Sequence, residues 1–275
     1  MLTRLARLIA LGSLASFAGA CGTAAPSIAD SPPRPSPHAI FDAVAPSVVA
    51  VLNDDRGDRE KEVKDLEAKL GKETRAPGHV IDVSLRREPS PHGTGFVVEG
   101  GDVVTAAHVV FRPDRLKLTS RSGQTVDADV VRIDEVRDIA ILHPRTPLKG
   151  VPAVPLETRA VAVGEPVWAL GHTGHGVWAL SWGMSEGIAS GFVDMFGARL
   201  LLFDAAVYPG FSGGPVVTVD ADGKAHVVGV NHAILYTGGS IIPMAPISSA
   251  IAVSEISDVI AGTSPAFESV LSDYA

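Results

Sequence analysis

The sequence lacks a pair of cysteines, an excess of basic residues and an apolar run long enough to span a membrane. It has one cysteine, Cys21, in 275 residues, so no disulfide can form within the chain. Basic residues are fewer than acidic ones, 23 against 31, and the resulting net charge of −8 argues against nucleic acid as a partner. The apolar run Leu8 to Ala20 is shorter than the roughly 20 residues that a membrane-spanning helix needs.

The first 21 residues read as an export signal rather than a buried helix or a membrane anchor. Arg4 and Arg7 supply a positive start, and the apolar run that follows ends in small residues. Cys21 stands directly after Ala18-Gly19-Ala20. This sequence can be a signal-peptidase site of the Ala-x-Ala kind, but it also resembles the lipobox of bacterial lipoproteins, with Ala18 where Leu is commonest. We therefore expect either lipidation of Cys21, with an anchor in a membrane of the bacterial envelope, or simple secretion.

Composition divides the rest of the chain into three parts. Residues 22–37 are rich in Pro, Ser and Ala and have too few apolar groups to offset the entropy of ordering, so we expect a tether. Residues 38–262 are long enough for a sizeable core without disulfides, and we expect them to form the folded domain. Residues 263–275 form a tail without a strong pattern.

The folded part reads as an all-β chain. Short apolar runs rich in Val, Ile and Ala are bounded by Gly, Pro and Asp, which is typical of barrels and sandwiches. Residues 146–150, Thr-Pro-Leu-Lys-Gly, make a natural crossover between an N-terminal half of about 38–147 and a C-terminal half of about 150–246. The expected strands are 47–52, 95–99, 102–106, 115–120, 126–133, 139–143, 167–170, 187–192, 200–205, 215–219 and 226–231.

Two further segments are helical in pattern. Ser248 or Ser249 can cap a short C-terminal helix over 250–260, whose apolar positions would pack on the second half. Residues 54–75 are mostly charged, with a few apolar residues at helical spacing. That segment is either a solvated helical excursion between strands or a loop that regulates access or assembly.

Three blocks supply one residue each for nucleophilic catalysis. They are Thr105-Ala106-Ala107-His108, Asp138-Ile139-Ala140-Ile141-Leu142 and Gly210-Phe211-Ser212-Gly213-Gly214-Pro215. A hydroxyl is a poor nucleophile unless an imidazole takes its proton and a carboxylate fixes the imidazole's tautomer. The order His, Asp, Ser is that of the chymotrypsin-type double barrel. Each block alone would more readily be a turn or a packed core residue; together they predict a serine endopeptidase with its site in the cleft between the halves.

The glycines around Ser212 predict an oxyanion hole. A tight turn lets the N–H groups of Gly210 and Ser212 converge on one point, where the oxygen of a tetrahedral intermediate would sit.

The chain resembles the HtrA (Deg) family of bacterial trypsin-like serine proteases. This resemblance implies an all-β, chymotrypsin-like double six-stranded antiparallel β-barrel with a short C-terminal helix. It also implies that Ser212 is the nucleophile, His108 the general base and then acid, and Asp138 the orienting carboxylate. The matching segments, spread over most of the folded part, are 44–49, 93–98, 105–110, 138–142, 204–217 and 229–235.

The chain departs from the family pattern in three places. Too few residues follow Gly262 for the family's usual C-terminal PDZ domain. Phe211 replaces the usual Asn before the serine, so its ring must find a place near the cleft, and it cannot form the ion pair that activates zymogen-type relatives. His232 stands where the family usually has a small residue.

The expected substrate-binding residues are Ala206, Asn231, His232 and Ala233, the last three on a strand that would pair with the substrate backbone. The family resemblance places Ala206 at the base of the specificity pocket. An uncharged base cannot balance a buried Lys or Arg, so we expect a loose preference for small to medium aliphatic side chains. Alternatively, His232 reads an acidic side chain, as in glutamyl endopeptidases, although these carry their pocket histidine at the position of Asn231.

The expected partners are unfolded or exposed polypeptides of the cell envelope, with a homotrimer implied by the resemblance, and no cofactor. No metal is expected either, because His172 and His175 lie in a glycine-rich segment that reads as an exposed turn. The competing hypothesis is a protease-like peptide-binding module or holdase, in which Phe211 spoils the oxyanion hole.

Overall fold

The computed structural model describes residues 34–53, 91–110, 115–157, 159–173, 181–195, 197–235 and 247–262. The expected export signal, Cys21, the charged segment 54–75, His175 and the C-terminal tail lie outside the described residues. None of the helices in the described ranges is both long and apolar enough to cross a membrane.

The N-terminal half forms a closed antiparallel barrel of six strands, with the spatial order β1-β2-β3-β6-β5-β4. Its interior is filled mainly by valine, alanine and leucine, which suit the tightly curved, half-buried strands of a small barrel. The strands are β1 (Val48–Asn53), β2 (Pro91–Val97), β3 (Val103–Thr105), β4 (Leu116–Ser120), β5 (Thr125–Asp134) and β6 (Ile139–Pro144).

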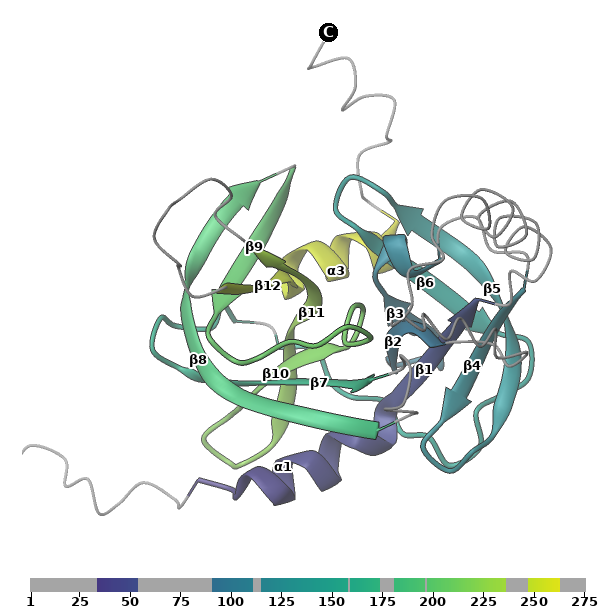
Figure 1. Ribbon diagram of the computed structural model, residues 1–275, viewed down its shortest axis with the longest axis horizontal. Helices are drawn as coiled ribbons and strands as arrows, with labels where there is room; N and C mark the ends of the chain where they lie inside the picture. Colours follow the sequence, from purple (N-terminus) through teal and green to yellow (C-terminus); the bar gives the residue numbers. More distant parts are fainter. Residues whose placement is uncertain are drawn as a thin grey trace, which may run out of the picture. The chain divides into compact units, whose positions relative to one another are not determined.

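The C-terminal half forms a second closed barrel of six antiparallel strands, with the order β10-β11-β12-β9-β8-β7. The predicted chymotrypsin-like double barrel is thereby confirmed, and Figure 1 shows the two barrels side by side. The strands are β7 (Pro166–Thr173), β8 (Ser181–Met195), β9 (Ala198–Phe203), β10 (Pro215–Val219), β11 (Ala225–Leu235) and β12 (Ile247–Ala252).

The short C-terminal helix is present but begins later than the sequence indicates. Ser248 and Ser249 lie in β12, which closes the second barrel, and helix α3 (Val253–Ala261) follows it directly. The apolar run over 248–252 suits a buried strand and a helix equally well, and barrel closure decides between them. Helix α3 ends at Gly262, whose φ of 71° is the left-handed conformation that glycine adopts without strain.

The chain enters the first barrel through a helix that the sequence analysis missed. Ser36 caps helix α1 (Pro37–Val44) by accepting a hydrogen bond from Ala39 N, and Pro37 occupies the first helical position. A short 3-10 turn, η2 (Ala45–Ser47), leads from α1 into β1. Ile40 and Val44 bury the apolar face of α1.

One apolar cluster joins the two barrels. It includes Phe96 and Ile139 of the first barrel, Trp168 and Val230 of the second, and Ile256 of α3. In Figure 1, α3 (yellow) lies between the barrels. This shared core fixes the two barrels against each other, and with them the residues that face each other across the cleft.

An ionic cluster reinforces the contact between α3 and the first barrel. Arg137 Nη1 donates to Asp134 Oδ2 at 3.1 Å, and Arg137 Nε lies 2.6 Å from Glu255 Oε2 on α3. All three side chains are at most 15% exposed. Because each charge is mostly out of water, losing one partner would leave the others uncompensated.

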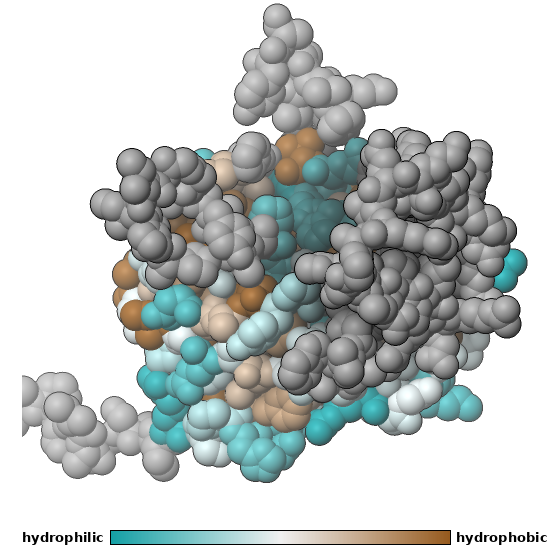
Figure 2. All heavy atoms as spheres, in the orientation of Figure 1, coloured by the Kyte–Doolittle hydropathy of each residue, from teal (hydrophilic) through white to brown (hydrophobic). Residues whose placement is uncertain are grey.

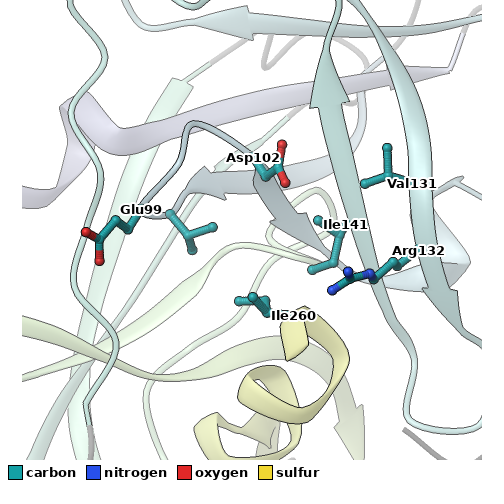
Figure 3. Close-up of a pocket in the computed structure, with 7 residues that line it drawn as sticks. Glu99, Asp102, Val131, Arg132, Ile141 and Ile260 are labelled. Carbon is teal, nitrogen blue, oxygen red and sulfur yellow. The ribbon is translucent and has the colours of Figure 1, made fainter. Parts of the chain in front are cut away.

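A pocket of about 340 Å³ lies where β5 and β6 approach α3. Figure 3 shows the Arg132 side chain beside Ile141 and Ile260, with Glu99 pointing away from it. Arg132 donates to the carbonyl of Val259 near the end of α3. The pocket therefore surrounds a structural contact of the helix, and it is lined by none of His108, Asp138 or Ser212.

Large exposed apolar side chains are scattered in the described part of the chain: Val131, Ile133, Val163, Ile188 and Tyr208. On the face drawn in Figure 2, apolar and polar residues are intermixed among the coloured atoms. The coloured atoms of that view thus form no broad apolar area of the kind that marks a large docking surface.

Acid should weaken the second barrel through Glu165. Hydrogen bonds from Arg159, then from Ala162 N and Thr218, lower the pKa of this carboxyl to about 2, while burial opposes them. The resulting stability is present above the ordinary pKa of 4.5 and is lost as the pH falls from there towards 2. Allowing for solvent screening of Arg159, we expect about 1 kcal/mol of unfolding free energy to depend on Glu165.

Urea unfolding at pH 7 and pH 3 tests this expectation. The Glu165→Gln variant should be less stable than wild type at pH 7 and should lose less stability on acidification. Glu186→Gln, which changes an exposed glutamate on the neighbouring strand β8, is the matched control. Equal acid sensitivity of Glu165→Gln and wild type would contradict the assignment.

Candidate active site

His108 lies where β3 ends, on the 3-10 turn η3 (Ala107–Val110). Its Nδ1 is 2.7 Å from Asp138 Oδ2, and its backbone N–H donates to Asp138 Oδ1 at 2.8 Å. The ring is about half exposed, whereas the Asp138 side chain is 15% exposed. Because Nδ1 faces the carboxylate, that nitrogen carries the proton, and Nε2 is left as an acceptor.

Asp138 has an unusual backbone conformation, between β5 and β6. Its φ of 59° makes it the one non-glycine residue with positive φ in the described part of the chain. Aspartate tolerates this left-handed conformation better than most residues. The Asp138 carbonyl accepts a hydrogen bond from Ala107 N, so backbone and side chain of Asp138 both bind the turn that carries His108.

Ser212 follows a tight turn of the second barrel. Phe211 N donates to Tyr208 O at 2.9 Å, with Pro209 and Gly210 between them, and the φ of Gly210 is +101°. Proline followed by a residue of positive φ is the pattern of a type II turn. In the described residues no acceptor is found for the N–H of Gly210 or of Ser212. Both amides therefore remain available to an oxyanion.

The Ser212 segment packs against the first barrel, close to the turn that carries His108. Thr94 N, on β2, donates to Ser212 O at 2.8 Å. A Cβ atom on Gly213 would collide with the Thr105 hydroxyl and with Ala106 N, so only glycine allows this close approach. The serine turn thus lies against the residues that immediately precede His108, although more than 100 positions separate them in the sequence.

The serine and the histidine are not yet hydrogen-bonded to each other. Within the ranges that the structure describes, no hydrogen bond joins the Ser212 hydroxyl to His108. Such contacts are often long in substrate-free enzymes and tighten when substrate binds.

The Phe211 ring, which was expected near the cleft, lies inside the second barrel. Its side chain is 1% exposed and belongs to the apolar interior of the second barrel. The ring lies over Gly171 and Gly183, which pair across β7 and β8, and a Cβ on Gly171 would collide with it. Phe211 therefore anchors the serine turn from beneath, in space that the paired glycines provide.

Thr94 is a further residue of this site that the sequence analysis missed. Its hydroxyl donates to the carbonyl of Gly210 at 2.6 Å and accepts from His172 N at 3.2 Å, and the residue is fully buried. Thr94 thereby ties the first barrel to the peptide that joins Gly210 to Phe211. The sequence offered one signal, a hydroxyl between two glycines in Gly93-Thr94-Gly95.

The expected substrate-binding residues differ in position. Ala206 is exposed beside the serine turn. Asn231 is fully buried: its side chain donates to Leu170 O, and its carbonyl accepts from Gly213 N. The Asn231 side chain thus supports the serine turn from inside the barrel, and a contact between the strand that carries Asn231 and the substrate backbone stays a prediction. The side chain of Ala233 lies outside the described residues.

His232 faces the first barrel, and His172 departs from expectation. His232 Nε2 lies 3.4 Å from Asp138 Oδ2, so this ring faces the carboxylate that His108 binds. His172 is fully buried on β7, with its ring edge against Trp182, and not in an exposed turn. No group of three or more His, Cys, Asp or Glu side chains in the described residues could hold a metal ion.

The chain is similar in sequence to several known proteins. Residues 93–230 match the family model of the trypsin-like peptidase domain. The putative serine protease HhoA of Synechocystis is 30% identical over 61% of this chain and 43% of its own length. Bovine mitochondrial serine protease HTRA2 is 36% identical over 54% of this chain and 32% of its own.

A bacterial relative and a solved structure extend these similarities. The probable periplasmic serine endoprotease DegP-like of Chlamydia muridarum is 29% identical over 58% of this chain and 33% of its own length. The chain thus spans about a third to two-fifths of the curated relatives it matches. The serine endoprotease of Yersinia pestis shares the fold, with a TM-score of 0.59 and 21% identity over 84% of this chain and 67% of that one.

Proposed function

This chain belongs to the trypsin-like peptidase family, with HtrA- and DegP-like relatives, and from that premise we propose that it is a serine endopeptidase acting through His108, Asp138 and Ser212. The observation that carries the proposal is the meeting of two elements. One is the His108 imidazole, held by the Asp138 carboxylate at 2.7 Å. The other is the serine turn of the second barrel, which is bound to the first barrel through Thr94.

The proposed reaction needs only these side chains and two amides. Ser212 Oγ attacks the carbonyl carbon of the scissile peptide and gives its proton to His108 Nε2. The N–H groups of Gly210 and Ser212 stabilise the oxyanion, and Asp138 stabilises the imidazolium that forms. His108 then protonates the leaving amine, and a water activated by the same imidazole hydrolyses the acyl-enzyme.

The proposed substrates are unfolded or exposed polypeptides. We propose that an extended chain adds as a strand beside the end of β11, after Val230, where the pairing of β11 with β10 ends. Ala206 places no charge near the serine turn. We therefore expect a loose preference for small to medium aliphatic side chains before the scissile bond, worth about 1 to 3 kcal/mol per methylene. A location in the bacterial envelope fits the relative described as periplasmic; the lipid anchor on Cys21 and a homotrimer are further parts of the proposal.

Cleavage of β-casein by the full chain tests this function. We expect cuts at many sites in β-casein, a loosely folded substrate, and few cuts in a stable folded protein. The competing binding module would hold β-casein without turnover. The binding-module hypothesis rests on Phe211 disrupting the oxyanion hole. The Phe211 ring is buried beneath the serine turn, which argues against such a disruption. Stoichiometric binding with no cleavage would nevertheless favour the binding module.

Thr94 should matter to turnover because its hydroxyl holds the Gly210 carbonyl. Thr94→Val keeps the shape of the side chain but removes this hydrogen bond, so the oxyanion hole loses its support. We expect kcat to fall by roughly 10²-fold, as for a 1 Å misplacement, with KM within a factor of about three. Peptide hydrolysis at several substrate concentrations measures both constants.

Thr119→Val is the matched control, because the Thr119 hydroxyl bonds only to that of Thr125 on the exposed side of the first barrel. It should leave kcat unchanged. If Thr94→Val retained full kcat, the cross-barrel bond would have no part in forming the oxyanion hole.

A further inference from the structure

His232 sits at an irregularity of strand β11. In the pairing with β12, Asn231 faces Ala250 and Ala233 faces Ser249, so His232 between them has no partner residue. A residue inserted in this way forms a β-bulge, which turns its side chain out of the regular alternation. Asn231 points into the barrel, whereas the next side chain, that of His232, reaches Asp138 of the first barrel.

The His232 ring is placed between two groups. Its Nε2 is 3.4 Å from Asp138 Oδ2, the same oxygen that lies 2.7 Å from His108 Nδ1. Its Nδ1 lies 3.5 Å from the Ser249 hydroxyl on β12. The two histidine rings are 6.3 Å apart, with their planes at 73°. Two imidazoles therefore approach Asp138 Oδ2, and each imidazole comes from a different barrel.

His232 is neutral near neutral pH. Burial lowers the pKa of its imidazole; the Asp138 carboxylate acts in the opposite direction, and the nearby His108 lowers the pKa further. Among the described residues, Asp138 and His108 are the titratable groups that face this ring. A neutral imidazole carries one N–H, and the carboxylate favours that proton on Nε2, which leaves Nδ1 to accept from Ser249.

We propose that His232 is a positioning residue, which fixes the Asp138 carboxylate from the second barrel while His108 binds it from the first. The inference rests on the proposed function, since it gives His232 a part in the same reaction. The His232 ring occupies the space beside Oδ2, so the carboxylate is restrained from turning away from His108. The neutral N–H also shares the negative charge of Asp138, so the support that Asp138 gives to the imidazolium form of His108 depends on His232.

This role differs from that of a specificity residue. A histidine that reads an acidic substrate side chain must present a free N–H or a positive charge to it. In this structure His232 Nε2 lies 3.4 Å from Asp138 Oδ2, and burial opposes the positive charge. No preference for acidic side chains is therefore expected from His232.

Acid should affect the site through His232. When His232 gains a proton, a positive charge stands beside Asp138 and opposes the imidazolium that His108 forms during the reaction. Because burial holds the pKa of His232 below its usual range, this loss sets in below neutral pH, and the acid limb of kcat/KM against pH should be less steep once His232 is removed.

Three variants test the proposal in the full chain: His232→Ala, His232→Gln and the control His226→Gln. His226 lies on the same strand and is paired with Asp220 at 2.8 Å, away from Asp138. We expect His232→Ala to lower kcat on the order of tenfold with little change in KM, below the roughly 10²-fold cost of a 1 Å misplacement. His232→Gln, which keeps an N–H donor, should recover part of kcat, and the control should match wild type.

Two results would overturn the proposal. One is an unchanged kcat with an unchanged acid limb in His232→Ala. The other is an effect confined to KM for substrates with an acidic residue before the cut, which would make His232 a specificity residue instead.

A measurement that needs no turnover separates this proposal from the proposed function. NMR titration of His232 in Asp138→Asn should show its midpoint moved to lower pH, because the carboxylate that raises its pKa has been replaced. An unmoved midpoint would remove the contact on which the inference depends, whether or not the chain cleaves peptides.

Discussion

Replacing Ser212 with alanine should lower the rate of β-casein cleavage by about 10⁶-fold, the loss seen when the nucleophile of such a triad is removed. No other hydroxyl is proposed to attack the peptide carbonyl, so the chain would keep only what its backbone amides and binding groups supply. The rate is measured by release of fluorescence from labelled casein, under conditions in which wild type digests it within minutes.

The fold of this variant should be intact. Ser212 is held by its backbone, through Thr94 N, and the described residues make no hydrogen bond to its hydroxyl. Circular dichroism and the unfolding midpoint should therefore match wild type. Ser257→Ala, on the exposed side of α3, is the matched control and should cleave casein at the wild-type rate. Persistent cleavage by Ser212→Ala would assign the attack to another group.

Replacing Asp138 with asparagine should lower kcat by roughly 10⁴-fold, because an amide in place of the carboxylate favours the wrong tautomer of His108. Asparagine is the informative change at this position. Like aspartate it tolerates a φ near +59°, so the turn that carries His108 should remain folded. Steady-state hydrolysis of a peptide substrate at pH 7 to 8 measures the loss, and substrate binding should change little.

Asp129→Asn serves as the control in the first barrel. Asp129 pairs with Arg145 at the surface, and its side chain is about half exposed. This variant should retain wild-type kcat. A loss at Asp138→Asn no greater than that of Asp129→Asn would mean that the carboxylate beside His108 has no catalytic role.

The barrels could be predicted because strands of this kind carry a local signal. Alternating or continuous apolar runs between Gly, Pro and Asp located most strands of both barrels, and the family resemblance supplied their closure. The helix α1 was missed because the prolines and serines before it, which read as a tether, include its cap Ser36 and its first residue Pro37. The strand β12 was taken for the start of a helix, since Ser248 is a good cap by type but its hydroxyl donates to Ala205 O inside the barrel.

The features of the site that could not be predicted from the sequence depend on contacts between residues that lie far apart in the chain. Phe211 looked like an obstacle because nothing local shows that Gly171 and Gly183 leave room for its ring. Thr94 lies just before the expected strand 95–99, and its role depends on the carbonyl of Gly210, 116 positions away. His232 was expected on a strand that binds substrate, and its contact with Asp138 could not be foreseen because Asp138 belongs to the other barrel.

The most direct test of the central claim is to react the full chain with a fluorophosphonate and to locate the adduct by peptide mass spectrometry. Such probes label a serine only when a neighbouring base activates its hydroxyl. We predict one probe per chain, attached to Ser212, and its loss in His108→Ala. A folded protein that takes up no probe, or that carries it on another serine with His108 dispensable, would contradict the account.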